Sequence, residues 1–294
     1  MKLALGTVQL GLNYGVSNIS GQPSFEEAEA ILALAQKSGI HCLDTAIAYG
    51  ESHSVLGRLK HLTNHAQIVT KLPPFAGEQF DQQAIQVYLD YIEQSFVDLK
   101  QARLYGMLFH QASDLLKQGA NQLCDALLEQ KSQGNILKTG ISLYGHDPIS
   151  DLLLNRYVDL VQIPFNCFDT HFKHPSFVQQ CKDNQIEVHA RSCFLQGLLL
   201  MKPDAIPNYF SPWKKQILTF AQLAQAFKVP PSALAMAYVL REPHIDKLVV
   251  GVNSHHELEQ LIAHYEIAQS LDTQNLPDLS IEDANLTNPA NWQC

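Results

Sequence analysis

The chain has 294 residues, of which 46% are hydrophobic and 17% are charged, a composition typical of a globular protein with a sizeable core. Its 29 acidic and 20 basic residues give a formal net charge of -9. That balance argues against nucleic acid or an anionic membrane as a main partner, because both favour clustered Lys and Arg. No stretch reaches the roughly 18 apolar residues that a membrane-spanning helix needs.

The N-terminal run MKLALGTVQLG contains one Lys and a short apolar stretch that Gly6 interrupts. A secretory signal needs a longer apolar stretch and a small-residue cleavage site, so this run predicts a first strand over 3–11. No CxxC pair occurs among the six cysteines, which stand at positions 42, 124, 167, 181, 193 and 294. Scattered thiols of this kind are typical of reduced core residues, and we expect a cytoplasmic protein.

Along the chain, short apolar runs alternate with longer segments of helical period. After the first strand, Ser24 is placed to cap a helix over 23–39, with Glu27 three residues later and Gly39 at its end. Further strands are predicted at 41–46, 67–73, 103–110, 137–145, 159–166, 187–194 and 247–252. Further helices are predicted at 52–60, 82–99, 121–134, 147–155, 175–184, 214–227, 231–241 and 254–266.

Eight strand-then-helix units predict an α/β protein with a closed (β/α)8 fold, a TIM barrel. The rival fold, a doubly wound sheet, usually carries a GxGxxG turn after its first strand, and Gly6, Gly11 and Gly15 do not have that spacing. No linker is visible. We therefore expect one domain over 1–294, with a polar tail at about 270–294 that wraps over the barrel.

Four ionisable side chains fall at the predicted strand ends, where barrels of this class build their active sites. Asp44 and Tyr49 follow the second strand, Lys71 ends the third and His110 ends the fourth. Taken singly, each has an ordinary structural interpretation: a turn cap, a packed ring, a solvated amine or a core histidine. Their shared position at one rim favours a common catalytic site.

These residue types suit proton transfer to a carbonyl oxygen. A tyrosine with a pKa near 10 is a poor acid unless its phenolate is stabilised, and a nearby ammonium held by a carboxylate supplies that stabilisation. His110 would position the substrate oxygen. Hydride is the natural attacking group, because no nucleophilic Ser or Cys motif is visible. The histidines form no HExxH motif, so we expect no metal site.

The segments GTVQLG, LDTAIAYGES, VTKLP and FHQASD resemble the aldo/keto reductase family, whose catalytic tetrad is Asp, Tyr, Lys and His in that order. The resemblance spans nearly the whole chain and fills the tetrad with Asp44, Tyr49, Lys71 and His110. It implies an NAD(P)-dependent oxidoreductase that interconverts an aldehyde or ketone and an alcohol by hydride transfer, with Tyr49 as general acid.

The resemblance also implies where the nicotinamide cofactor binds. Ser142 and Gln162 would hold the nicotinamide amide, although Leu143 stands where the family usually has Asn, and the guanidinium of Arg191 would stack on the ring. After the eighth strand, GVNS offers donors at a helix N-terminus, a ready anion site. The full expected cofactor site is Gly6, Thr7, Asp44, Ser142, Gln162, Arg191, Ser192, Phe194, Leu195, Gln196, Gly197, Gly251, Val252, Asn253, Ser254, Glu257 and Gln260.

The resemblance to the family implies NADP(H) as the cofactor, and NAD(H) remains an alternative. Asn253 and Glu257 stand where members that prefer NADP(H) often have Lys or Arg, and the side chains of His255 and His256 would be partial substitutes for those cations.

The expected substrate is a small carbonyl or sugar-like compound that contacts Tyr14, Tyr49, His110 and Trp213. A monomer or small homo-oligomer is expected. Two alternatives remain open at this point. One is a regulatory subunit that binds the cofactor but turns over very slowly. The other is a sugar-modifying enzyme that uses bound nicotinamide cofactor for epimerisation or elimination.

Overall fold

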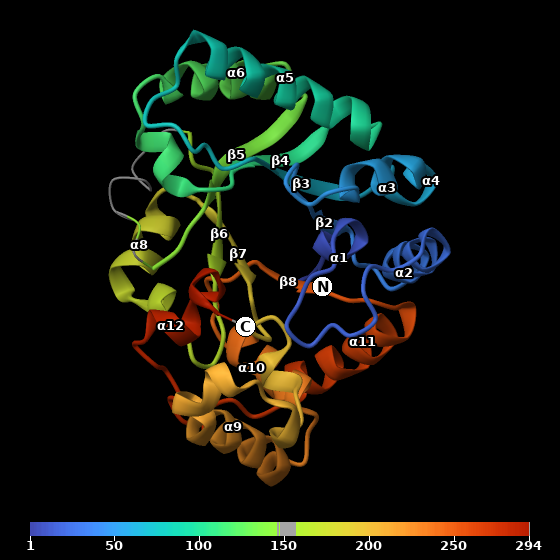
Figure 1. Cartoon of the computed structure of the whole chain (residues 1–294), viewed down its shortest axis with the longest axis vertical. Coiled ribbons are helices and arrows are strands. Elements are labelled where there is room, and N and C mark those ends of the chain that lie inside the picture. The colour runs from blue at the N-terminus through green and yellow to red at the C-terminus, as the bar shows by residue number, and fades with distance from the viewer. Residues whose placement is uncertain (146, 148–156, 294) are drawn as a thin grey trace.

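The computed structural model describes residues 1–145, 147 and 157–293. Eight parallel strands close into a barrel in the order β1-β2-β3-β4-β5-β6-β7-β8, and helices surround it (Figure 1). The predicted TIM barrel is therefore confirmed. The seam is closed by the first and last strands, which pair from Leu3 with Leu248 to Gly6 with Gly251.

The strands are β1 (Leu3–Gly6), β2 (Cys42–Asp44), β3 (Gln67–Leu72), β4 (Leu104–Phe109), β5 (Ile136–Ser142), β6 (Leu160–Pro164), β7 (Glu187–Arg191) and β8 (Lys247–Gly251). The α-helices are α1 (Val8–Gly11), α2 (Phe25–Lys37), α3 (Ser52–Arg58), α4 (Lys60–Thr63), α5 (Gln82–Leu99), α6 (Ala120–Ser132), α8 (Pro175–Asp183), α9 (Lys214–Phe227), α10 (Pro231–Leu240), α11 (His255–Ser270) and α12 (Ala284–Thr287). Short 3-10 helices are η1 (Ala112–Leu116), η2 (His171–Lys173), η3 (Leu198–Leu200), η4 (Pro203–Ala205), η5 (Asn208–Trp213) and η6 (Pro289–Asn291).

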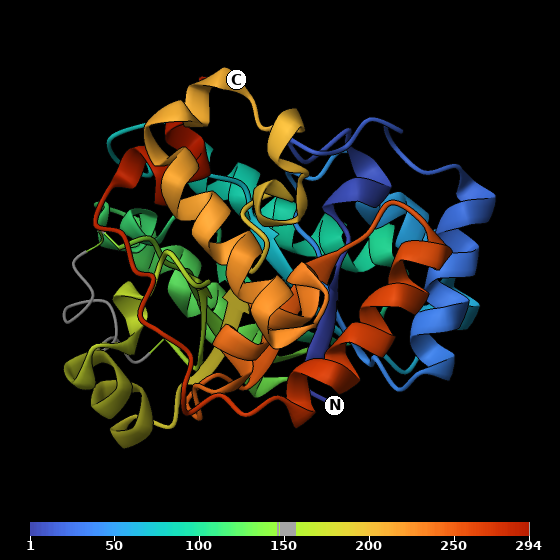
Figure 2. The ribbon, with the colours of Figure 1, turned by 90° about the horizontal axis from the view of Figure 1, so that it is seen from below.

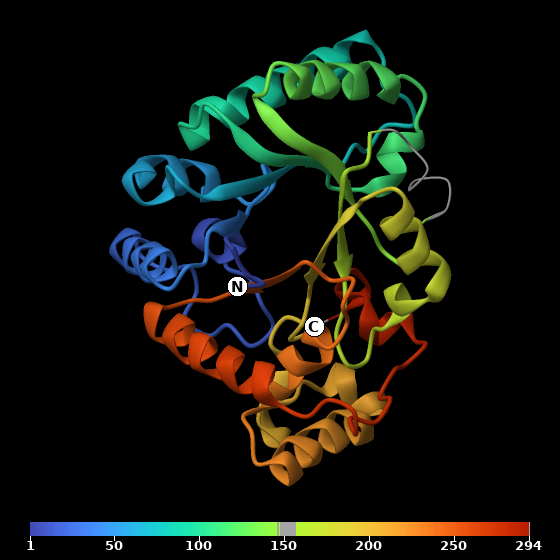
Figure 3. The same ribbon diagram turned by 180° about the vertical axis from the view of Figure 1, so that it is seen from behind.

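Local signals account for the ends of α2. The Ser24 hydroxyl accepts the backbone N–H of Glu27 at 3.2 Å, and Gly39 adopts a φ of +76° just after the helix. Both features match the predicted cap and stop. The helix packs beside α11, and the two lie next to each other in Figures 2 and 3.

The predicted strand over 3–11 was too long. β1 ends at Gly6, and residues 8–11 form the short helix α1. The reason is tertiary: Thr7 is fully buried at the rim and bonds the Asp44 carbonyl through both its backbone N–H and its hydroxyl, each at 2.9 Å. The strand predicted over 187–194 was also too long, because Ser192 adopts a φ of 62°, which a strand cannot contain. The predicted helix over 147–155 lies, apart from residue 147, outside the described residues.

Two groups of apolar residues form the core. A small cluster inside the barrel includes Ala4, Val69 and Leu108, and a much larger one fills the space between the strands and the surrounding helices. The cysteines at 42, 124, 167, 181 and 193 are buried, and Cys294 lies outside the described residues. In the described part of the chain, no helix is both long and apolar enough to span a membrane.

After α11 the chain climbs the outside of the barrel to α12 beside the mouth (Figure 2). The Ile281 N–H donates to the Phe168 carbonyl at 2.8 Å, and Leu286 is fully buried. The rings of Trp292 and Phe210 meet edge to face, with centroids 4.8 Å apart. The tail therefore packs along the barrel.

Candidate active site

The strand register brings the predicted tetrad to one rim of the barrel. Asp44 ends β2, Lys71 is the last residue but one of β3, and His110 directly follows β4. Tyr49 lies in the turn between β2 and α3. Parallel pairing sets Asp44 beside Val69, and Lys71 beside Leu108, so all four side chains reach the carboxyl ends of neighbouring strands.

Asp44 and Lys71 form a buried ion pair with 2.6 Å between Oδ1 and Nζ. The Lys71 side chain is completely buried, and its ammonium also donates to the Thr45 carbonyl at 2.9 Å. Gln162, from β6, donates its amide N–H to the same Asp44 oxygen at 2.7 Å. Burying two charges is costly unless their hydrogen bonds are satisfied, and here one carboxylate receives two strong donors.

The turn that carries Tyr49 is held by a close contact between two backbones. A Cβ added at Gly11 would lie 1.8 Å from the Tyr49 carbonyl oxygen, and one added at Gly50 would lie 2.4 Å from the Gly11 carbonyl oxygen. Gly50 also has a φ of +54°, a conformation that favours glycine. The hydroxyl of Ser52 bonds those of Thr7 and Thr45, at 2.8 and 3.0 Å. The position of Tyr49 is therefore set by α1 and by the end of β1.

The Tyr49 ring lies close to both the Lys71 ammonium and the His110 ring. Lys71 Nζ is 5.1 Å from the ring centroid, and the His110 ring meets Tyr49 edge to face with centroids 5.8 Å apart. Burial raises the pKa of Tyr49, the Asp44 carboxylate raises it further, and the Arg191 guanidinium opposes both. Tyr49 is therefore a protonated phenol at neutral pH.

His110 is held neutral. Burial lowers its pKa to about 4, with the cationic side chains of Lys71 and Arg191 contributing and Asp44 opposing. Its Nδ1 is buried and has no hydrogen-bond partner among the described residues. Burial also lowers the pKa of Lys71, and the Asp44 carboxylate opposes that shift. A neutral imidazole and a protonated phenol thus face the same space.

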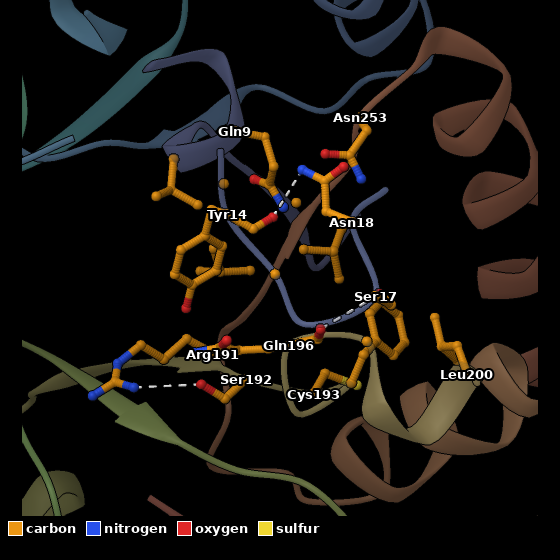
Figure 4. Close-up of a pocket in the computed structure, with 18 of the residues that line it drawn as sticks. Gln9, Tyr14, Ser17, Asn18, Arg191, Ser192, Cys193, Gln196, Leu200 and Asn253 are labelled. Carbon is orange, nitrogen blue, oxygen red and sulfur yellow. Dashed lines mark hydrogen bonds between the residues drawn. The ribbon is translucent and has the colours of Figure 1, made fainter. Parts of the chain in front are cut away.

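A cavity of about 660 Å³ opens above this group and continues to α11. Tyr14 and Arg191 lie near the catalytic end, and Figure 4 shows Tyr14 pointing toward Arg191. Burial, with a contribution from Tyr49, raises the pKa of Tyr14 to about 12, and Arg191 opposes the shift. The Arg191 guanidinium lies 4.3 Å from the centroid of the Tyr144 ring and donates to the Leu143 carbonyl at 3.2 Å.

A loop over 192–197 forms one wall of the cavity and adopts an unusual backbone. Ser192, Leu195, Gln196 and Gly197 all have positive φ, between 46° and 92°. Several such residues in one loop store strain, which is common at ligand sites. The loop contacts the N-terminal segment: Ser17 donates its hydroxyl to the Gln196 carbonyl at 3.5 Å, and a Cβ at Gly197 would collide with the Ser17 hydroxyl (Figure 4).

Most of the residues expected at the site line this cavity. They are Gly6, Thr7, Tyr14, Asp44, Tyr49, His110, Gln162, Arg191, Ser192, Phe194, Gln196, Gly197, Gly251, Asn253, Glu257 and Gln260. Lys71 lies beneath it. Four more expected residues do not reach its wall: Ser142, Leu195 and Val252 are buried, and Ser254 caps α11 through a bond from the Glu257 N–H.

Trp213, expected at the substrate, lies away from the cavity wall. It ends η5, and its indole N–H donates to Asp283 at 3.1 Å. The ring thus serves to hold the C-terminal tail. Another polar residue away from the cavity wall is His53. It is buried and bonds the Thr70 hydroxyl at 2.8 Å, because α3 turns it toward β3.

Several lining residues were not anticipated. Among them are Gln9, Ser17, Asn18, Tyr144, Ser232 and His264. Gln9 lies in the GTVQLG segment, for which the pattern predicts strand, whereas residues 8–11 form α1. The amide nitrogen of Asn18 donates to the carbonyls of Tyr14 and Gly21, which folds the loop back over the mouth. Ser232 and His264 come from α10 and α11, where sequence offers no signal of proximity.

Of the seven buried polar side-chain atoms that lack a hydrogen-bond partner among the described residues, four belong to residues that line this cavity. They are Gln9 Oε1, Gln162 Oε1, Asn253 Oδ1 and His110 Nδ1. Buried polar atoms are normally hydrogen-bonded, so such a set is the mark of a ligand site. Three of the four are oxygen acceptors, which fits a ligand rich in amide and hydroxyl donors. The described residues hold no group of three or more His, Cys, Asp or Glu suited to a metal.

Comparison with known proteins agrees with this geometry. The sequence model of the aldo/keto reductase family matches residues 2–280. Two solved structures of proposed aldo-keto reductases from Pseudomonas aeruginosa share the fold. One has a TM-score of 0.65 and 22% identity over 92% of this chain and 90% of its own. The other has a TM-score of 0.64 and 21% identity over 92% and 91%. No sequence among curated proteins matches the chain significantly.

Proposed function

Because this chain belongs to the aldo/keto reductase family, we propose that it is an NAD(P)H-dependent oxidoreductase that reduces an aldehyde or ketone to an alcohol, or catalyses the reverse. One observation carries the proposal: the buried Asp44–Lys71 pair, 2.6 Å apart, lies below a protonated Tyr49 and a neutral His110. The bound nicotinamide would supply or accept the hydride.

Tyr49 is the proton donor in this proposal. A general acid must carry its proton before the reaction, and the raised pKa of Tyr49 meets that requirement. The acid must also lose the proton as negative charge develops, and the Lys71 ammonium 5.1 Å from the ring centroid would stabilise the phenolate. Asp44 orients that ammonium, and its bond from Gln162 keeps the carboxylate in place.

His110 would orient the substrate oxygen. A neutral imidazole donates one N–H and keeps one acceptor nitrogen, and its pKa of about 4 keeps it in that form at neutral pH. The ring lies edge to face against Tyr49 and both residues line the cavity, so in this proposal both donors would act on the same substrate oxygen. Such an arrangement would stabilise an alkoxide without adding a further cation to those of Lys71 and Arg191.

The residues present fit a nicotinamide dinucleotide. Gln162 uses its amide nitrogen on Asp44, which leaves its buried oxygen free to accept from a carboxamide. Arg191 lies at the same end, and the 192–197 loop would follow the pyrophosphate. The resemblance implies NADP(H); the choice between NADP(H) and NAD(H) depends on the opposite end of the cavity. The buried free thiols of Cys42, Cys167, Cys181 and Cys193 support a reducing, cytoplasmic setting.

The test compares the wild-type protein with Tyr49→Phe. Nucleotide binding is measured by fluorescence titration, and turnover is measured with a panel of aldehydes and ketones. We expect Tyr49→Phe to lose at least 10²-fold in turnover while binding nucleotide about as tightly as wild type. Equal turnover would reject Tyr49 as the acid. Tight binding without turnover on the whole panel would favour the regulatory alternative, and product formed without net nucleotide consumption would favour the sugar-modifying one.

A further inference from the structure

The cavity has two ends with different chemistry. Tyr49 and His110 mark the end where the reacting ring must lie, since Tyr49 donates the proton there. The other end is lined by Ser232, Asn253 and Glu257, together with Gln260 and His264. An extended dinucleotide that reacts at Tyr49 therefore brings its adenosine ribose to this second end, where the only difference between NAD(H) and NADP(H) is a 2′-hydroxyl or a 2′-phosphate.

The N-terminus of α11 is at this end, and a free helix N-terminus would suit a phosphate. Its donors are already used by side chains of this protein. The Asn253 N–H donates to Glu257 Oε2 at 2.7 Å, and the His255 N–H donates to Glu27 Oε1 at 2.5 Å. The Glu257 N–H donates to the Ser254 hydroxyl at 3.1 Å. Two carboxylates thus occupy the position that an anionic ligand would need.

Two of the side chains that line this end, those of Asn253 and Glu257, present acceptors to a ligand. Asn253 directs its amide nitrogen toward Glu257 Oε2, at 3.5 Å, so its Oδ1 is the atom left buried and without a partner in the described structure. Glu257 adds a carboxylate. A hydroxyl can donate to either group, whereas a phosphate dianion brings acceptors alone and a like charge.

At this end of the cavity, the described lining residues include no lysine or arginine that could offset the acidity. Among the described residues that line the cavity, the single such side chain is Arg191, which lies at the catalytic end. The His255 ring is paired with Glu27 at 2.8 Å. His264 bonds Ser232 at 2.6 Å, and burial lowers its pKa, so it is not a ready cation.

We infer that the acceptor set of Asn253 and Glu257 selects NAD(H) over NADP(H), with Glu257 as the specificity-determining residue. The inference rests on the proposed function, because it assumes that a nicotinamide dinucleotide lies in this cavity. It departs from the NADP(H) preference that the family resemblance implies. Because NADP(H) would meet one repulsive charge and one unmatched acceptor, we expect NAD(H) to bind more tightly by about tenfold or more in Kd. A tenfold difference is equivalent to about 1.4 kcal/mol.

The experiment titrates the full-length protein with NADH and with NADPH, measuring Kd by nucleotide fluorescence and by calorimetry at low and high salt. Wild type should bind NADH at least about tenfold more tightly. Glu257→Gln, which keeps an acceptor and removes the charge, should tighten NADPH binding several-fold and change NADH binding little. Salt should reduce the preference of wild type, because the carboxylate is solvent-exposed.

The matched control is Glu259→Gln. Glu259 is on the same helix, its side chain is 71% exposed, and it does not line the cavity. It should leave both Kd values unchanged. NADPH binding as tight as NADH in wild type would overturn the inference and leave the proposed function intact. An unchanged NADPH affinity in Glu257→Gln would overturn the role of Glu257. Failure of both nucleotides to bind would overturn the proposed function and this inference with it.

Discussion

Gln162 and Lys71 donate to the same oxygen of Asp44, at 2.7 and 2.6 Å, from opposite sides of the barrel mouth. Lys71, one of the two donors to Asp44, lies below Tyr49, the proposed proton donor. The other, Gln162, has its free carbonyl oxygen in the cavity. A change in Gln162 therefore acts on ligand binding directly and on the proton donor indirectly, and the two effects are separable by experiment.

Gln162→Met should weaken nucleotide binding. It removes the buried acceptor and one of the bonds to Asp44 while keeping the volume of the side chain. We expect Kd to rise about tenfold or more, because a hydrogen bond to a polar ligand contributes about 1 kcal/mol and a bond to a charged group more. Gln179→Met, on the exposed face of α8, is the control. Unchanged affinity in Gln162→Met would remove this amide from the cofactor site.

Lys71→Met should reduce both stability and turnover. It leaves the buried Asp44 carboxylate without its cation, which costs about 3–5 kcal/mol in the free energy of unfolding. Turnover should fall at least 10²-fold. The double variant Lys71→Met with Asp44→Asn removes both charges and should recover most of the stability in urea unfolding but none of the turnover. Recovery of turnover in the double variant would contradict the assigned role of the pair.

Gly11→Ala should impair catalysis without touching the cavity. Its methyl group would meet the Tyr49 carbonyl oxygen at 1.8 Å, so the turn that carries the phenol must shift. A displacement of about 1 Å at a catalytic group can cost about 10²-fold in rate. We expect a fall in kcat with nucleotide Kd nearly unchanged. Gly106→Ala, where the nearest atoms lie at 3.4 Å or beyond, is the control and should keep wild-type kcat.

Stability should fall as the pH drops from about 6.5 to 4. Burial lowers the pKa of His53 and of His110 to about 4 in the folded protein, so the unfolded chain binds more protons in that window. Stability then rises with pH, by about 1.4 kcal/mol per pH unit for each proton. His53→Gln should flatten the dependence of the unfolding free energy on pH, whereas exposed His61→Gln should not. Identical slopes for wild type and His53→Gln would contradict the prediction.

The fold and the catalytic group were predictable from local pattern. Alternation of strands and helices defines the barrel, and Asp44, Lys71 and His110 occupy equivalent places at consecutive strand ends, where topology alone brings them together. Boundaries failed where tertiary contacts decide them. The hydroxyl of Thr7 bonds the Asp44 carbonyl, and Ser192 has a positive φ in its loop. The carboxyl ends of β1 and β7 were therefore predicted too late in the chain.

The far end of the cavity was beyond sequence reasoning for a related reason. Glu27 reaches the N-terminus of α11 from a helix more than 200 residues earlier in the chain. No spacing or motif encodes that contact. The GVNS segment before a helix therefore predicted free backbone N–H donors. In the folded chain, the carboxylates of Glu27 and Glu257 accept from the N–H groups of His255 and Asn253. Trp213 shows the opposite error: an aromatic residue in a long loop suggested substrate contact, and its indole instead holds Asp283.

Because β1 pairs with β8, the barrel can close only after most of the chain has been synthesised. Tyr49 and its supporting turn emerge from the ribosome early, whereas β8 and α11 emerge late. The two ends of the cavity are therefore assembled from opposite halves of the nascent polypeptide, and a nucleotide has nothing complete to hold until the last strand is in register. Nucleotide binding would then report that the ring of strands has closed, and it would favour the closed ring over partly opened forms.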